Sequence, residues 1–192
     1  ASGYQEVMLL GQNVNSYGKD LGNTDFASLL RRLHTIEGLK RIRYMTSHPK
    51  DFTFALADTI AELPKVCRHF HLPVQSGCDK TLQAMNRKYD TAHYEEIYSY
   101  LKEKFPEAAF TTDLIVGFPG ETEEDFAATL DFVKRCQFDM AYTFLYSKRS
   151  GTPAATMLNV VGNTSSAMLA ARVVDGKNWM KPNAMAGKKD GQ

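Results

Sequence analysis

The sequence predicts an α/β fold in which parallel strands are joined by helices. Short apolar runs alternate with amphipathic stretches, and this unit recurs after roughly 25 to 40 residues. Each apolar run also ends in a polar or glycine-rich tail. Strand–helix alternation of this kind implies right-handed crossovers, so the sheet is either an open doubly wound sheet or a barrel.

The predicted elements follow one another in a regular order. Thr24 caps a helix that Gly38 stops, residues 51–63 form a helix that ends before Pro64, and Thr91 and Thr122 begin two further helices. In each helix the apolar positions recur at helical spacing and form one face. The strands that alternate with these helices are residues 6–10, 41–45, 69–74, 109–116 and 140–146.

Composition excludes several classes of protein. The 192 residues hold 23 Lys+Arg and 22 Asp+Glu, a net charge of +1, which excludes a globally basic nucleic-acid binder. At 43% hydrophobic residues the chain can bury a core, and its apolar runs are far shorter than a membrane span. The first residues do not resemble a signal peptide, so we expect a cytoplasmic protein with no membrane partner.

The three cysteines, Cys67, Cys78 and Cys136, are odd in number and do not follow a common metal-ligand spacing. We expect them to be reduced and structural, and we predict no metal site on this chain. A metal ion held by a pair of them across the fold is the alternative.

The polar tails are the strongest functional signal. All five follow a strand and none precedes one, and the carboxyl ends of parallel strands share one edge. These tails therefore predict a single ligand site, although loops are commonly polar for no functional reason. They comprise residues 11–18, 46–49, 75–77, 117–122 and 147–152.

The fourth tail favours a neutral ligand over a phosphate. Its glycine turn and helix start could aim backbone N–H groups at an anion, but acidic residues at 121 and 123–125 crowd the first turn. Pro119 and Gly120 fit the central positions of a type II turn, and Gly117 removes a side chain where the strand ends. A flat, neutral group could approach this backbone closely. Asp113 is either bonded within the fold or faces the ligand.

Catalytic motifs are lacking elsewhere. The sequence has no Gly-x-Ser-x-Gly, Gly-x-Gly-x-x-Gly or Walker motif. His48, His69 and His71 are candidates for acid–base chemistry, although a structural role is favoured for each. A site rich in amides, hydroxyls and glycines suits a cofactor that supplies its own reactivity.

Five motifs, in order, closely resemble the methylthiotransferases of the radical S-adenosylmethionine superfamily. The first motif resembles the branch that acts on isopentenyladenosine next to the tRNA anticodon, and the alternative is the branch that acts on a ribosomal protein. The motifs are LLGQNVNSYG (9–18), RYMTSHP (43–49), HLPVQSG (71–77), DLIVGFPGET (113–122) and YSKRSGTPAA (146–155).

The resemblance implies a partial (βα)6 TIM-like barrel that binds S-adenosylmethionine beside a 4Fe-4S cluster. It also implies a tRNA anticodon stem-loop as substrate, an auxiliary 4Fe-4S cluster, and an electron donor such as flavodoxin or ferredoxin. By resemblance, the cofactor-binding residues fall into four groups. Gly11, Gln12 and Asn13 meet the methionyl amino group, Gln75 and Ser76 face the ribose or carboxylate, Val116 and Gly117 lie against adenine, and Arg149 steadies a carboxylate or the RNA phosphate unless it has only a surface role. Asp113 is the remaining candidate, on the argument from the residues given above.

The departures from the family indicate an internal fragment. The Cys-x-x-x-Cys-x-x-Cys loop of the family is expected before residue 1, so we expect the barrel to lack its first strand and this chain alone to be inactive. The resemblance covers residues 1–157, the partial core domain. Residues 158–192 are an atypical tail, either a frame-shifted end or a lineage-specific segment.

Two hypotheses from other classes remain. A non-catalytic RNA-binding fragment would need clustered basic residues, and only Arg31, Arg32, Arg41 and Arg43 form a modest group. An aldolase-type barrel would need a Schiff-base lysine in a strand, and none of the five predicted strands has one. An unpaired edge at residues 6–10 predicts self-association.

Overall fold

The computed structural model describes residues 3–147. The predictions on Arg149, on most of the fifth tail and on residues 158–192 therefore lie outside the described residues. In the part described, no helix is long and apolar enough to cross a membrane.

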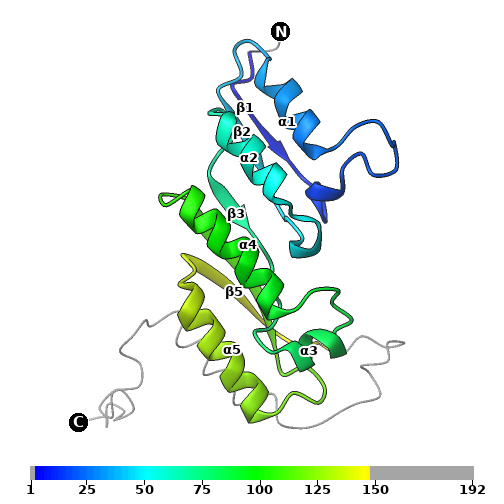
Figure 1. Ribbon diagram of the computed structural model, residues 1–192, viewed down its shortest axis with the longest axis vertical. Coiled ribbons are helices and arrows are strands. Elements are labelled where there is room, and N and C mark those ends of the chain that lie inside the picture. Colours follow the sequence, from blue (N-terminus) through cyan, green and yellow to red (C-terminus); the bar gives the residue numbers. More distant parts are fainter. Residues whose placement is uncertain (1–2, 148–192) are drawn as a thin grey trace, which may run out of the picture.

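Five parallel strands form the centre of the fold, and their order in space follows their order in the chain (Figure 1). β1 pairs with β2, and β3, β4 and β5 pair in that order. The Ile42↔Val66 bridge and the bond from Ser47 N–H to the His71 carbonyl (3.0 Å) connect the two groups. The strands are β1 (Glu6–Leu9), β2 (Arg41–Tyr44), β3 (His69–His71), β4 (Ala109–Val116) and β5 (Met140–Leu145).

This order decides between the two predicted architectures. A doubly wound sheet reverses its strand order at a switch point, whereas a barrel adds each strand beside the previous one. The sequential order observed here is that of a partial barrel, as predicted.

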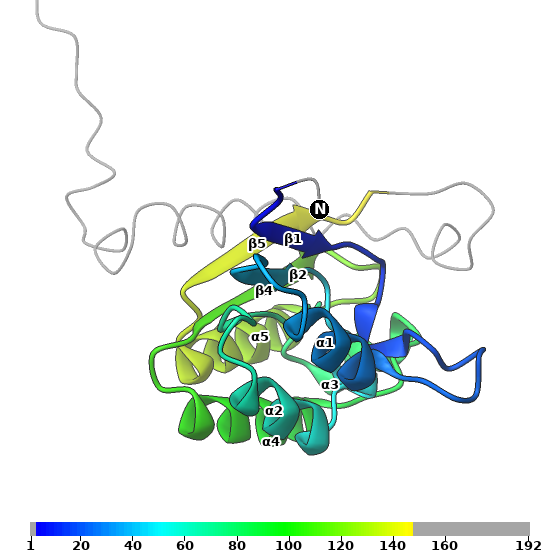
Figure 2. The same cartoon turned by 90° about the horizontal axis from the view of Figure 1, so that it is seen from above.

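The helices lie on one side of the sheet (Figure 2). No helix of the described residues covers the opposite face, which carries Arg41, Arg43 and the half-exposed Tyr142. The helices are α1 (Phe26–His34), α2 (Phe54–Glu62), α3 (Asp79–Ala84), α4 (Thr91–Lys104) and α5 (Glu123–Cys136).

The core fills the space between the sheet and the helices. Phe70 of β3 is fully buried, and its ring stacks on Phe110 with centroids 5.4 Å apart and contacts Phe52 and Phe105 edge-on or tilted. Burying one such side chain contributes about 1.5–3 kcal/mol. Because the neighbours of Phe70 on either side, His69 and His71, point to the other face, the alternation of β3 separates the core from the open side.

Capping residues set the helix starts. α1 begins after Asp25 rather than Thr24, because the Asp25 carboxylate accepts from the Ser28 N–H at 2.7 Å. α2 begins after Thr53, later than predicted, because Pro49–Asp51 forms a separate 3-10 turn, η2. At α5, Thr122 caps the helix as predicted and forms a capping box with Asp125.

Several predicted boundaries were too generous, and one helix was missed. The prediction carried β3 to residue 74, but the strand ends at His71, two residues before Pro73, which has no N–H to donate. α1 ends at His34, before Gly38. The short helix α3 follows Cys78, whose side chain makes no cap, so no local signal marks its start.

Candidate functional site

The carboxyl ends of the strands lie along one edge, as predicted, because all the strands are parallel. Hydrogen bonds link each described tip to the next. The Val14 N–H donates to the Thr46 carbonyl at 3.2 Å, and the Gln75 N–H donates to the Asp113 carbonyl at 2.8 Å. The loops after β1, β2, β3 and β4 therefore form one connected rim (Figure 1).

The loop after β1 carries the first predicted group of residues. Gly11 and Gln12 are exposed at the tip. The Asn13 Nδ2 donates to Asp51 Oδ2 at 2.6 Å, and its Oδ1 accepts from the His48 N–H at 3.3 Å. The Asn13 side chain is therefore bonded to the neighbouring loop.

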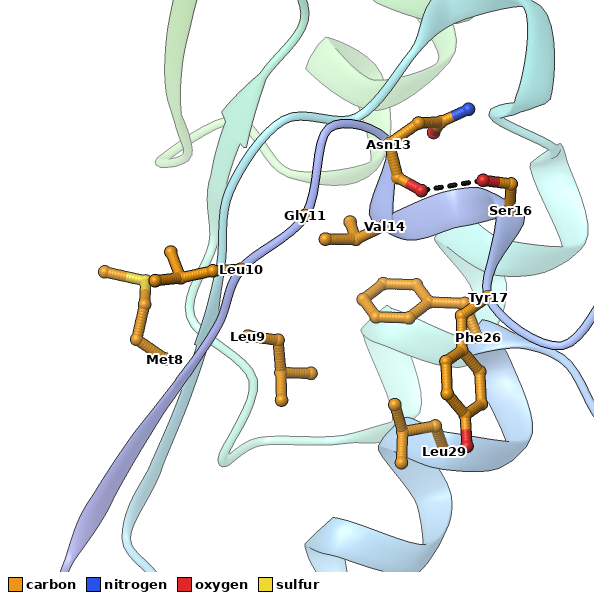
Figure 3. A pocket seen from close by; sticks show the side chains of 10 residues that line it. All are labelled: Met8, Leu9, Leu10, Gly11, Asn13, Val14, Ser16, Tyr17, Phe26 and Leu29. Atoms are coloured by element: carbon orange, nitrogen blue, oxygen red, sulfur yellow. Dashed lines mark hydrogen bonds between the residues drawn. The ribbon is translucent and has the colours of Figure 1, made fainter.

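A cavity of about 460 Å³ opens beside this tip, between β1 and α1 (Figure 3). Of the eight predicted site residues that the structure describes, only Gly11 and Asn13 line it, and its other walls are mostly apolar side chains such as Leu9, Phe26 and Leu29. Figure 3 shows the Asn13 amide turned away from these side chains. The cavity thus adjoins the rim but does not gather the predicted residues.

The loop after β3 is packed tightly against α5. The Ser76 hydroxyl, fully buried, lies 3.1 Å from Thr129 Oγ1, and the Gly77 N–H donates to the same oxygen at 3.1 Å. Gln75 has φ +72°, a left-handed conformation that costs a non-glycine residue of order 1–3 kcal/mol. The Gln75 backbone is held by bonds to both sides, with its carbonyl accepting from the Ile115 N–H at 2.8 Å.

The loop after β4 contains the predicted type II turn at Pro119 and Gly120. Gly120 has φ +86°, and the Glu121 N–H donates to the Phe118 carbonyl at 2.9 Å, as a type II turn requires. Val116 is buried, and Gly117 has φ +72°. The Gly117 N–H donates to Glu121 Oε2 at 2.6 Å, so the chain's own carboxylate occupies the position that an anion would take. Burial raises the pKa of Glu121.

Asp113 faces the open side of the sheet beside His71. Its Oδ2 lies 3.6 Å from His71 Nε2, and the Asp113 side chain is 26% exposed. The Thr111 hydroxyl lies 3.1 Å from His69 Nε2 and 3.0 Å from His71 Nδ1. Burial lowers the pKa of His69. These histidines are bonded within the fold, which agrees with the structural role favoured for them.

Two buried polar side chains in the rim loops have no hydrogen-bond partner within the fold. They are Asn15, through both amide atoms, and Ser47, through its hydroxyl. A buried polar group without a partner is costly, and such groups are rare. The loops that follow β1 and β2 therefore hold hydrogen-bonding capacity that a ligand could use.

None of the three cysteines belongs to a cluster of three or more metal-binding side chains within the described residues. No group of three His, Cys, Asp or Glu side chains within residues 3–147 could hold a metal ion. Burial raises the pKa of Cys136 to about 12, which keeps it a thiol, and Cys78 Sγ donates to Asp125 Oδ1 at 3.3 Å. All three are free cysteines, as predicted.

Sequence reasoning missed four residues that shape the rim, namely Lys19, Asp51, Glu121 and Thr129. Lys19, Asp51 and Thr129 form hydrogen bonds with residues far away in the sequence, and Glu121 bonds to the backbone on the other side of a turn. Neither periodicity nor motif spacing identifies such contacts. Glu121 alone had a local signal, the acidic helix start, which was interpreted only as a repulsive charge.

The chain is similar to proteins of known family. A profile of the radical SAM superfamily matches residues 1–133. The tRNA-2-methylthio-N(6)-dimethylallyladenosine synthase of Pelotomaculum thermopropionicum is 60% identical over 156 residues, 81% of this chain and 35% of that protein. The protein of the same name from Alkaliphilus oremlandii is 56% identical over 178 residues, 92% of this chain and 38% of that protein. The chain thus spans little more than a third of these relatives' length.

Solved structures share the fold at low sequence identity. Methylornithine synthase (PylB) superposes with a TM-score of 0.59 at 14% identity, over 91% of this chain and 49% of that one. Elp3 of the archaeon Methanocaldococcus infernus gives a TM-score of 0.55 at 14% identity, over 80% of this chain and 40% of that one. Since the profile match covers more than half of the sequence and the parallel strands follow the same fold, this chain belongs to the radical SAM superfamily.

Proposed function

We propose that this chain is the S-adenosylmethionine-binding core of a tRNA methylthiotransferase, which adds a methylthio group to isopentenyladenosine next to the anticodon. The observation that carries this proposal is the identity of 60% and 56% to two relatives named for that tRNA modification, over 81% and 92% of this chain. The superfamily profile, which matches residues 1–133, covers the rim loops after β1, β2, β3 and β4.

The rim suits S-adenosylmethionine as the bound cofactor. The orphaned amide of Asn15 and hydroxyl of Ser47 are uncharged groups of the kind that bind a methionyl or ribose moiety. The Val116–Gly117 backbone offers a flat approach for adenine, and Glu121 already occupies the N–H that a phosphate would use. S-adenosylmethionine, when bound, supplies radical chemistry that the side chains of this rim lack.

The described residues do not suit a 4Fe-4S cluster, because they present no group of three ligands. We infer that the cluster-ligating cysteines belong to a part of the parent protein outside this sequence, and that this chain alone is inactive. In that enzyme the rim residues of this chain would bind and orient the cofactor. The tRNA anticodon stem-loop and a flavodoxin or ferredoxin electron donor are the partners that this function requires.

A chimera tests the proposed function. Residues 3–147 would replace the matching segment of the Pelotomaculum thermopropionicum protein, and the reconstituted chimera would be assayed anaerobically on an anticodon stem-loop containing isopentenyladenosine. We expect mass spectrometry of the digested RNA to show the methylthio nucleoside. Modification of a ribosomal protein instead would favour the alternative branch. Neither product, from a folded and cluster-loaded chimera, would contradict the proposal.

A second measurement tests the inference about the cluster. The 192-residue chain would be incubated anaerobically with iron and sulfide and then desalted. We expect no stable brown chromophore, because the described residues lack the ligands. A stoichiometric 4Fe-4S spectrum on this chain would contradict the inference.

A further inference from the structure

The amide of Asn13 is gripped at both ends by the segment that follows β2. Its Nδ2 donates to Asp51 Oδ2 at 2.6 Å, and its Oδ1 accepts from the His48 N–H at 3.3 Å. Asp51 and His48 are themselves fixed relative to each other, since the Asp51 N–H donates to the His48 carbonyl at 3.0 Å within η2. The two-point contact therefore connects two rigid turns.

The Asn13 side chain makes this contact instead of capping the helical turn that follows it. It occupies the N-cap position of η1 (Val14–Ser16), where an asparagine side chain normally accepts from a backbone N–H of the first turn. Here the side chain makes no cap, and the Asn13 backbone carbonyl instead accepts from the Ser16 hydroxyl at 2.8 Å. The side chain is thus committed to the neighbouring loop.

Two residues near the Asn13–Asp51 contact have left-handed backbone conformations, Thr46 and Gly18. Thr46 has φ +61°, a strained conformation that turns its carbonyl toward the Val14 N–H. On the other side, Gly18 has φ +83°, and a Cβ there would lie 2.3 Å from the Thr24 carbonyl oxygen. This tight turn brings Lys19 to the second oxygen of Asp51.

We propose that Asp51 is a positioning residue that holds the loop after β1 in its binding conformation by gripping Asn13. Asp51 is suited to this role because its side chain is only 13% exposed while both of its oxygens accept hydrogen bonds. Burial acts to raise the pKa of Asp51, but the bonds from Lys19 and Asn13 outweigh it and hold the pKa below its ordinary value. The carboxylate is therefore charged at neutral pH.

Three variants separate the parts of this contact. Asp51→Ala removes both bonds, Asp51→Asn keeps an oxygen that can accept from Asn13, and Lys19→Met removes only the ion pair. Asp58→Ala is the matched control, because Asp58 also accepts from a lysine and a neutral donor, Lys104 and Tyr100, but bridges α2 and α4 away from the rim.

Amide hydrogen exchange of the 192-residue chain is the primary measurement. In Asp51→Ala we expect exchange at Val14 and Ser16 to quicken about tenfold or more, since the loop loses a hydrogen bond to a charged and largely buried group. Exchange in β4 should stay unchanged, and Asp51→Asn should restore part of the loop's protection, because its bond from Asn13 is uncharged and weaker. Lys19→Met should change little, because Lys19 is 60% exposed and surface ion pairs are weak.

The proposal would be overturned by unchanged exchange in Asp51→Ala, by an equal rise throughout β4, or by no restoration in Asp51→Asn. An effect of Asp58→Ala on Val14 equal to that of Asp51→Ala would also overturn it, because the loop would then respond to any loss of an ion pair.

The consequence for the ligand rests on the proposed function. Saturation-transfer NMR would measure the dissociation constant of S-adenosylmethionine for the same chain and variants. We expect Asp51→Ala to weaken binding about tenfold and Asp51→Asn to weaken it less. Equal affinity in wild type and Asp51→Ala would overturn the role of Asp51 in the site. If the wild-type chain took up no S-adenosylmethionine, the proposed function would fail and hydrogen exchange would decide the role of Asp51.

Discussion

At the residue scale, a half-buried carboxylate takes the place of an external anion in the turn before α5. Glu121 Oε2 accepts from the Gly117 N–H at 2.6 Å, while its Oε1 is buried without a partner. Burial raises the pKa of Glu121 above its ordinary value of 4.5. The folded chain therefore binds more protons than the unfolded chain between pH 4.5 and the raised pKa, and stability falls as pH rises through that interval.

Replacing this carboxylate should flatten the pH dependence of stability. Glu121→Gln keeps an oxygen for the Gly117 N–H but cannot ionise, so its free energy of unfolding relative to wild type should grow between pH 4.5 and 7. Urea denaturation across that range checks this expectation, with the exposed Glu62→Gln as control. If the free energy of unfolding varied with pH in the same way in wild type and Glu121→Gln, the burial of this carboxylate would not affect the pH dependence of stability.

Three of the residues that the sequence did not identify, Lys19, Asp51 and Thr129, make contacts over long distances in the sequence. Asp51 and Lys19 meet across 32 positions, and Gly77 meets Thr129 across 52. Sequence patterns describe neighbours along a helix or strand, so contacts of this range become visible only when the elements are placed. The Pro119–Gly120 turn, by contrast, was predicted because its conformation depends on local residues alone.

At the element scale, the close approach of the β3 loop to α5 depends on one glycine. A Cβ at Gly77 would lie 2.4 Å from the Phe132 Cβ and 2.8 Å from the Thr129 Cα, contacts that neither atom can avoid without moving the helix. This approach places the Gly77 N–H on the Thr129 hydroxyl and fixes the position of Gln75 at the rim.

Gly77→Ala should therefore destabilise the chain by about 1–3 kcal/mol, the usual cost of overpacking. Thermal and urea denaturation measure this loss. Gly11→Ala is the control, because its Cβ would meet Val14 Cγ1 at an ordinary 3.5 Å. A loss at Gly77 no larger than that at Gly11 would mean that α5 moves freely away from the loop.

Element boundaries show where sequence reasoning reaches its limit. Thr24 and Asp25 can both cap a helix, and only the bond to Ser28 shows that Asp25 does so. β4 was predicted with its observed bounds, because Gly117 follows its last residue directly and marks the end of the strand. α3 was missed because it has only six residues and because Cys78, which precedes it, makes no side-chain cap.

At the scale of the whole molecule, β1 presents an unpaired edge within the described residues, because its only strand partner there is β2. Apolar side chains flank that edge, with Met8 40% exposed and Tyr4 81% exposed. A second cavity, of about 530 Å³, lies along the same edge and includes Val7, Leu33 and Ile36. Exposed edges of this kind pair with other chains.

We therefore expect the 192-residue chain to self-associate. Light scattering after size-exclusion chromatography should give a mass above 21.5 kDa that rises with concentration. Met8→Lys, which places a charge on the edge strand, should shift the chain toward the monomer, whereas Leu21→Lys, on an exposed loop, should not. A compact wild-type monomer at all concentrations would contradict this expectation.

β2, β4 and β5 each pair with the strand made just before them, and this order also bears on how the polypeptide acquires its shape during synthesis. Contacts between successive units require no distant segment to arrive first, so each new strand can add to a surface already present. During translation, each of these strands could therefore pair with the free edge of the strand that left the ribosome just before it.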